Sequence, residues 1–162
     1  MVHTYSIICN TMDVDVYMGG HMSDRRGWTC GAFDVLHPGH IELFKDAKSK
    51  CDYLLVGLQT DPSIDRSHKH KPIQSVTERF IMLDAIKYID EIVIYRTEKE
   101  LIEILNIHKP DIRINGSDWE DKKFTGCDLD IPHHFHRRNH SWSTTNIRER
   151  IYEEEKKLRN TK

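Results

Sequence analysis

The run YLLVGLQ at residues 53–59 is apolar at almost every position, and helical patterns lie on both sides of it. A strand of this kind has to be covered on both faces, as at the centre of a parallel sheet. Further strand-like runs alternate with helical segments along the chain, at residues 27–33, 90–95, 111–116 and 128–136. This alternation predicts an α/β protein with a parallel sheet of about five strands flanked by helices.

Composition narrows the class of protein. The chain has 162 residues, enough for one domain with a real core, and a formal net charge of −2, which indicates neither a nucleic-acid partner nor an anionic membrane. Its four cysteines form no C-x-x-C pair, so we expect free thiols in a reducing compartment. The sequence shows no apolar stretch of about 20 residues and no cationic signal region. We therefore expect a cytoplasmic protein.

The chain divides into two parts of unequal regularity. Residues 1–26 are expected to form an N-terminal extension, in which TYSIICN and VDVYM are candidate short strands. Residues 27–162 carry the regular alternation and are expected to form the main domain. Ligands of parallel sheets bind beyond the carboxyl ends of the strands. We therefore expect the loops that begin near Phe33, Thr60, Asn115 and His136 to open on the functional edge.

The stretch GAFDVLHPGH at 31–40 is a junction between a strand and a helix. Pro38 suits the first helical turn, and the spacing of His37 and His40 places both imidazoles on one side of that turn. The turn also offers free N–H groups to an anion, and Gly39 lets a phosphate come close to the backbone. Two histidines there can stabilise charge on a phosphoryl group in transfer. If only the four residues His37–His40 are considered, an ordinary capped helix without a bound anion is the alternative.

A second anion site is predicted at SWSTTNI, residues 141–147. Ser143, Thr144 and Thr145 can cap the last helix with hydroxyl groups while its N–H groups face a phosphate. An ordinary N-cap is the alternative for this segment.

The junction resembles the G-x-F-D-x-x-H-x-G-H signature of the HxGH nucleotidyltransferase superfamily. Within it, the chain is most similar to the cytidylyltransferases, especially those acting on glycerol 3-phosphate. Three further stretches carry the resemblance, in matching order: TERFIMLDAIKYIDEIV (77–93), GSDWEDK (116–122) and RRNHSWSTTNIRERI (137–151). The resemblance covers about residues 28–151 and implies a Rossmann-like fold that binds a nucleoside triphosphate and releases pyrophosphate.

The resemblance also implies roles for individual residues. His37 and His40 would be catalytic. The residues expected to bind the nucleotide are Ala32, Phe33, Asp34, Gly39, Asp118, Arg138, Ser143, Thr144 and Thr145. Those expected to bind the acceptor or its phosphate are Lys69, Lys71, Arg79, Lys87 and Trp119. Mg²⁺ would accompany CTP, with Asp34 as the one candidate protein ligand, and relatives of this type are commonly homodimers.

Plainer interpretations exist for several of these residues. Arg79 could be a solvated surface arginine, Asp34 could stabilise a turn, and Trp119 could be a hydrophobic plug. The histidines at 133, 134, 136 and 140 lack cysteine or acidic neighbours at ligand spacing, so a rim position is favoured over a zinc site. Strand alternation predicts His134 and His136 on one face and His133 on the other.

The leading hypothesis is transfer of CMP from CTP to glycerol 3-phosphate, giving CDP-glycerol and pyrophosphate. Alternatives within the superfamily are ATP as donor, or phosphoethanolamine, phosphocholine or a sugar phosphate as acceptor. A non-catalytic nucleotide-binding module is the alternative from another class. It is kept open by Ala32, where relatives have Thr or Ser, and by segment 138–143, which lacks the Glu and Gly of their R-T-E-G-I-S stretch.

Overall fold

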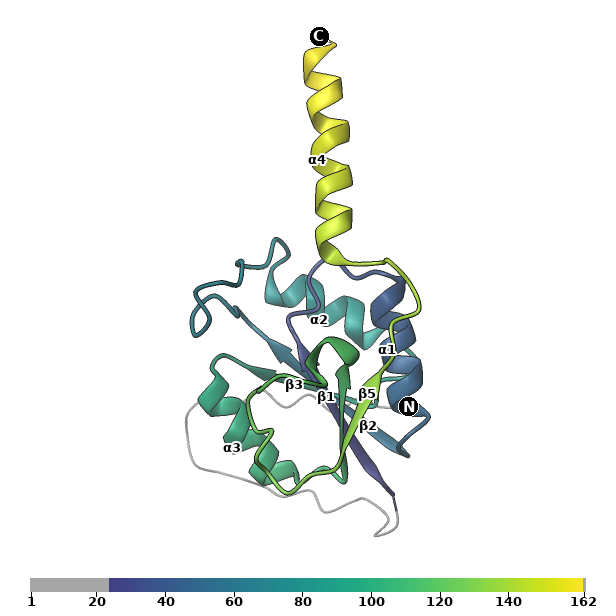
Figure 1. The fold of residues 1–162 in the computed structure, drawn as a ribbon, viewed down its shortest axis with the longest axis vertical. Coiled ribbons are helices and arrows are strands. Elements are labelled where there is room, and N and C mark those ends of the chain that lie inside the picture. Colours follow the sequence, from purple (N-terminus) through teal and green to yellow (C-terminus); the bar gives the residue numbers. More distant parts are fainter. Residues whose placement is uncertain (1–23, 162) are drawn as a thin grey trace.

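The computed structural model describes residues 24–161, so the two short strands expected within the N-terminal extension lie outside the described residues. Five parallel strands form one sheet in the order β3-β2-β1-β4-β5 (Figure 1). The strands are β1 (Arg26–Gly31), β2 (Tyr53–Gln59), β3 (Glu91–Tyr95), β4 (Ile112–Gly116) and β5 (His133–His136). The strand order reverses beside β1, where ligands of such sheets bind. The predicted Rossmann-like α/β class is confirmed.

Four α-helices and one 3₁₀ turn complete the described fold. They are α1 (Pro38–Lys48), α2 (Val76–Asp84), α3 (Glu98–His108), η1 (Ser117–Trp119) and α4 (Thr144–Asn160). A capping box opens α2, since the side chains of Ser75 and Glu78 each accept the other's backbone N–H. This helix ends at Asp84, because the chain turns at residues 85–89 and buries Ile86 and Ile89 against the core.

Strand β2 shows why the sheet is covered on both sides. Leu54, Val56 and Leu58 lie in the apolar layer that contains Phe44 of α1, whereas Leu55 lies in the opposite layer with Leu101 of α3. The β2 leucines and Val56 are fully buried, and each buried aliphatic side chain of this size contributes about 2 kcal/mol. The continuous apolar run therefore has partners on both faces.

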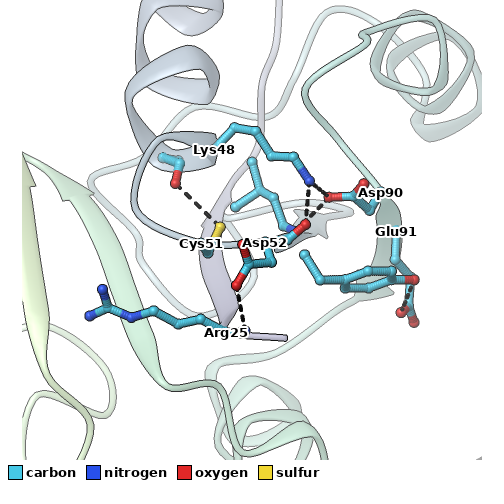
Figure 2. Close-up of polar contacts among 9 residues, drawn as sticks. Arg25, Lys48, Cys51, Asp52, Asp90 and Glu91 are labelled. Atoms are coloured by element: carbon cyan, nitrogen blue, oxygen red, sulfur yellow. Dashed lines mark hydrogen bonds and ion pairs between the residues drawn. The ribbon is translucent and has the colours of Figure 1, made fainter. Parts of the chain in front are cut away.

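Polar contacts close the amino edge of the sheet (Figure 2). Lys48 Nζ lies 2.5 Å from an Asp90 carboxylate oxygen and donates to the carbonyl of Asp52 at 2.7 Å. The Asp90 carboxylate also accepts the backbone N–H of Leu54, and Asp52 accepts that of Arg25. The charged side chains of Lys48, Asp52 and Asp90 at the amino edge are therefore engaged in contacts within the protein. We look for the ligand site at the carboxyl edge, where ligands of parallel sheets bind.

The last helix, α4, projects from the rest of the molecule (Figure 1). It has 17 residues, and none of them is buried. The start of α4 meets the domain at the carboxyl edge of the sheet, through Thr144 and Arg148. Among residues 24–161, no helix is both long enough and apolar enough to cross a membrane.

Candidate functional site

A strained turn joins β1 to α1. Phe33 and Val35 have φ angles of 49° and 50°, in the left-handed region that a β-branched residue such as Val35 rarely adopts. The turn is held by side chains: the N–H of Val35 donates to Gln74 Oε1 at 2.7 Å, and the buried Phe33 ring packs on Phe44. Strain of this kind persists where the surroundings enforce it, often at functional sites.

The two motif histidines lie together at the start of α1. The rings of His37 and His40 stack with their centroids 3.8 Å apart and their planes 20° from parallel. The backbone N–H of His37 donates to His40 Nδ1 at 3.4 Å. The Phe33 and His40 rings meet in a T-shaped contact with their centroids 5.5 Å apart. The predicted placement on one side of the first turn is confirmed.

Burial favours the neutral form of both imidazoles. Burial lowers the pKa of His40 to about 3, and His37 and Arg138 lower it further in the same direction. Burial also lowers the pKa of His37, with contributions from His140 and Arg138. A neutral imidazole still donates one N–H, and an anion bound beside the pair would favour protonation. The pair is thus suited to meet negative charge.

The start of α4 is fastened to the same turn. Thr144 Oγ1 donates to the backbone carbonyl of Asp34 at 2.9 Å, and Ser143 Oγ caps the helix by accepting the N–H of Asn146. Arg148 lies one turn further along α4, with Nη1 4.0 Å from Asp34 Oδ2. Two helix N-termini therefore converge on the β1–α1 turn. Sequence reasoning missed Arg148, although its spacing of four residues from Thr144 places both on one helix face.

Arg138 and Asp118 meet over the end of β4. Arg138 Nη2 lies 3.3 Å from Asp118 Oδ1, and a Cβ on Gly116 would lie only 2.5 Å from that oxygen. Gly116 therefore leaves room for the pair. Since Arg138 also lowers the pKa of both motif histidines, its charge belongs to the same site.

Asp34 is committed to the protein backbone. Its carboxylate oxygens accept the N–H groups of Ile73 and Gln74, each at 3.0 Å, and the residue is only 8% exposed. This geometry matches the turn-stabilising interpretation and anchors the end of loop 61–74. Within residues 24–161, no group of three His, Cys, Asp or Glu side chains could hold a metal ion.

The prediction that Arg79 binds phosphate is corrected by its contacts. Its side chain is buried at 2% exposure, and its guanidinium donates to the carbonyls of Ala32 and Gln59 at 2.7 Å and Thr60 at 2.6 Å. Nε donates to the carbonyl of Gln74. Arg79 therefore ties together the carboxyl ends of β1 and β2 instead of presenting its charge to a ligand. The Ala32 carbonyl is one of its anchors.

Lys87 is likewise displaced from the predicted site. It is exposed, lies just before β3 at the amino edge of the sheet, and rests 5.2 Å from the ring centroid of Tyr88. The strands separate it from the histidine pair at the carboxyl edge. Within one chain, Lys87 does not join the site.

Loop 61–74 approaches the segment after β4. Lys69 Nζ lies 6.0 Å from the ring centroid of Trp119, and Lys71 is exposed in the same loop. Trp119 is half-buried and meets Phe124 edge to face at 6.2 Å. The structure thus brings together one predicted acceptor-binding lysine and the predicted pocket tryptophan, and leaves Thr145 exposed at the start of α4.

The strand histidines follow the predicted alternation. His134 Nε2 and His136 Nδ1 each lie 2.9 Å from Asp46 Oδ2 of α1, whereas His133 meets Phe124 on the opposite face. Burial raises the pKa of Asp46, but the hydrogen bonds from His134 and His136 outweigh it, and the pKa lies below its usual value. A groove of about 490 Å³ runs beside this cluster, between α1 and β5. The cluster fastens the edge strand to α1.

Comparison with known proteins agrees with this geometry. The cytidylyltransferase-like family model matches residues 28–150. Bifunctional protein HldE of Paramagnetospirillum magneticum is 38% identical over 104 residues, which are 64% of this chain and 21% of that protein. HldE of Campylobacter jejuni subsp. jejuni serotype O:6 is 39% identical over 103 residues, 63% of this chain and 22% of that protein. The chain thus spans about a fifth of the length of these curated relatives.

Two solved structures share the fold. The lipopolysaccharide core biosynthesis protein of Thermoplasma volcanium aligns with a TM-score of 0.58 and 26% identity, over 74% of this chain and 99% of that one. Pantoate–β-alanine ligase of Francisella tularensis, in complex with an ATP analogue and β-alanine, has a TM-score of 0.58 at 16% identity. The alignment covers 80% of this chain and 67% of the ligase chain. At this identity, the likeness shows the fold alone.

Proposed function

The chain belongs to the cytidylyltransferase-like family, and we propose that it transfers a nucleoside monophosphate from a nucleoside triphosphate to a phosphorylated acceptor, releasing pyrophosphate. The observation that carries the proposal is the stacked pair His37 and His40, at a helix start where a second helix start converges. Both helix ends offer backbone N–H groups to phosphate. Such a site can bind a polyphosphate and stabilise charge that develops during transfer.

The reaction needs no covalent enzyme intermediate. An oxygen of the acceptor phosphate attacks the α-phosphorus in line and forms the new P–O bond, while the bond from that phosphorus to the α–β bridging oxygen breaks. The electron pair leaves with pyrophosphate. His37 and His40 donate hydrogen bonds to the phosphoryl oxygens, and Arg138 adds positive charge on the same side.

Mg²⁺ enters this proposal as part of the substrate, bound to the phosphates of the nucleotide. The residues that the structure describes do not fit a resident metal site, because both Asp34 oxygens already accept backbone N–H groups. The charge of the polyphosphate is met instead by Arg138, by Arg148 and by the two helix N-termini.

Two acceptors have support. CTP with glycerol 3-phosphate is favoured by the GSDWEDK stretch, whose Trp119 faces Lys69 of loop 61–74. A sugar phosphate, with ATP or CTP as donor, is favoured by the similarity to bifunctional protein HldE and to a lipopolysaccharide core biosynthesis protein. The site chemistry described above is the same for both.

The deciding experiment is a matrix of the four nucleoside triphosphates, each with Mg²⁺, against four acceptors: glycerol 3-phosphate, phosphoethanolamine, phosphocholine and a hexose 1-phosphate. Pyrophosphate release is the readout, and each triphosphate without acceptor is the control. We expect one donor–acceptor pair to exceed all others clearly. Binding of a triphosphate in a thermal-shift titration without pyrophosphate release from any pair would instead indicate a non-catalytic nucleotide-binding module.

A further inference from the structure

His140 lies outside the two motif histidines but directly over the turn that carries them. A Cβ on Gly39 would lie 2.7 Å from His140 Cε1 and 3.0 Å from both Cε1 and Nδ1 of His37. The two imidazoles therefore flank one point above the backbone of the first turn of α1. His140 reaches this point from the loop between β5 and α4, about 100 residues further along the chain.

The two ring nitrogens of His140 make no hydrogen bond within residues 24–161. Both ring nitrogens are shielded from solvent. His37 Nδ1, on the other side of the same point, is also buried and unpartnered. Buried polar atoms are nearly always paired, so unpartnered nitrogens on two imidazoles that lie over the same glycine indicate a ligand that hydrogen-bonds between them.

The ring of His140 is held by an apolar contact. The Trp142 ring stacks on it with centroids 4.6 Å apart and planes 30° from parallel, and Trp142 itself is 48% exposed. Stacking fixes where the imidazole sits and leaves both nitrogens available. His140 is thus in contact with the Trp142 ring and with the first turn of α1.

We propose that His140 is a third phosphate-binding histidine, which donates a hydrogen bond to a phosphoryl oxygen of the nucleotide between its own ring and His37. This inference rests on the proposed nucleotidyl transfer and adds a binding residue to it. The ligand is an anionic phosphate group, because His140 and Arg138 both act electrostatically on His37, and Arg138 also on His40. Among the described residues, no carboxylate contacts His140.

A matched pair of variants separates binding from packing. His140→Phe keeps an aromatic ring against Trp142 and removes both nitrogens, whereas His140→Ala removes the ring as well. Asn139→Ala, an exposed neighbour in the same loop, serves as the control. The dissociation constants of CTP and ATP, each with Mg²⁺, are measured by calorimetry, together with KM and kcat for the preferred triphosphate.

We expect both His140 variants to weaken triphosphate binding about tenfold or more, with KM raised in step, because a charge-assisted hydrogen bond is lost. The control should bind as the wild type does. Wild-type affinity in His140→Phe would overturn the proposal, since a packing role is restored by the ring. If the wild type itself binds neither triphosphate, the proposed function fails instead, and the two failures are distinct.

Discussion

Thr144 Oγ1 donates a hydrogen bond to the backbone carbonyl of Asp34 at 2.9 Å, joining two residues that are 110 positions apart in the chain. The bond connects the start of the projecting helix α4 to the turn that precedes the histidine pair. Because no residue of α4 is buried, this bond and the ion pair of Arg148 with Asp34 are what orients its first turn. The proposed phosphate site depends on this contact between its two helix ends.

Replacing Thr144 by Val should therefore impair triphosphate binding more than folding. The β-branched shape is kept, but the loss of one hydrogen bond costs about 1 kcal/mol and frees the first turn of α4. We expect KM for the triphosphate to rise about fivefold, with the melting temperature nearly unchanged. Thr161→Val is the matched control, because the Thr161 hydroxyl bonds a carbonyl at the far end of α4. Equal KM values for the two variants would contradict the role of the Thr144 bond.

Arg79 should prove essential for stability. Its substitution by Leu would leave three carbonyls at the ends of β1 and β2, and the carbonyl of Gln74 before α2, without this donor. We expect a cost of about 3 kcal/mol in the free energy of unfolding. Lysine should rescue little of it, because a single ammonium cannot reproduce the spread of a guanidinium. Urea unfolding measures the effect, with the exposed Arg159→Ala expected to change stability by less than about 0.5 kcal/mol. If Arg79→Leu lowered the free energy of unfolding as little as Arg159→Ala does, the structural role of Arg79 would be contradicted.

Stability should fall on mild acidification, in part through His40. Burial lowers the pKa of His40 from 6.5 to about 3. Below pH 6.5 the imidazole therefore binds a proton in the unfolded chain but stays neutral in the folded chain. The free energy of unfolding is therefore unaffected by the titration of His40 above pH 6.5, and it decreases as the pH falls from 6.5 towards 3. Between pH 7.5 and pH 5.5 we expect His40 to account for a loss of about 1 kcal/mol.

The measurement for His40 is urea unfolding of the wild type and His40→Asn at both pH values. Asparagine does not titrate, so its stability should decline less than that of the wild type over the same interval. Parallel declines would show that the pKa of His40 in the folded protein is close to its ordinary value.

The parts of the structure that sequence patterns predicted are those governed by local rules. YLLVGLQ at 53–59 is β2 residue for residue, because two-sided burial needs a continuous apolar run. The i, i+3 spacing placed His37 and His40 correctly on one turn. Each of these depends on neighbours within a few residues.

The errors concern residues whose direction depends on distant parts of the chain. An arginine in the first turn of a helix has the same local pattern whether it faces solvent or, like Arg79, the ends of two strands. Lys87 was assigned by resemblance, although a residue before a strand lies at the amino edge. His140 contacts Gly39 only because the loop after β5 folds back over α1, which no local spacing reveals.

The most direct test of nucleotidyl transfer at the histidine pair compares the wild type with His37→Ala and His40→Ala, using the donor–acceptor pair found in the substrate matrix. Pyrophosphate release and the mass of the nucleotide-linked product are followed together, and circular dichroism checks that each variant is folded. We predict one product molecule for each pyrophosphate in the wild type, and a fall in kcat of at least about a hundredfold in both folded variants. Near-normal turnover in either folded variant would contradict the account.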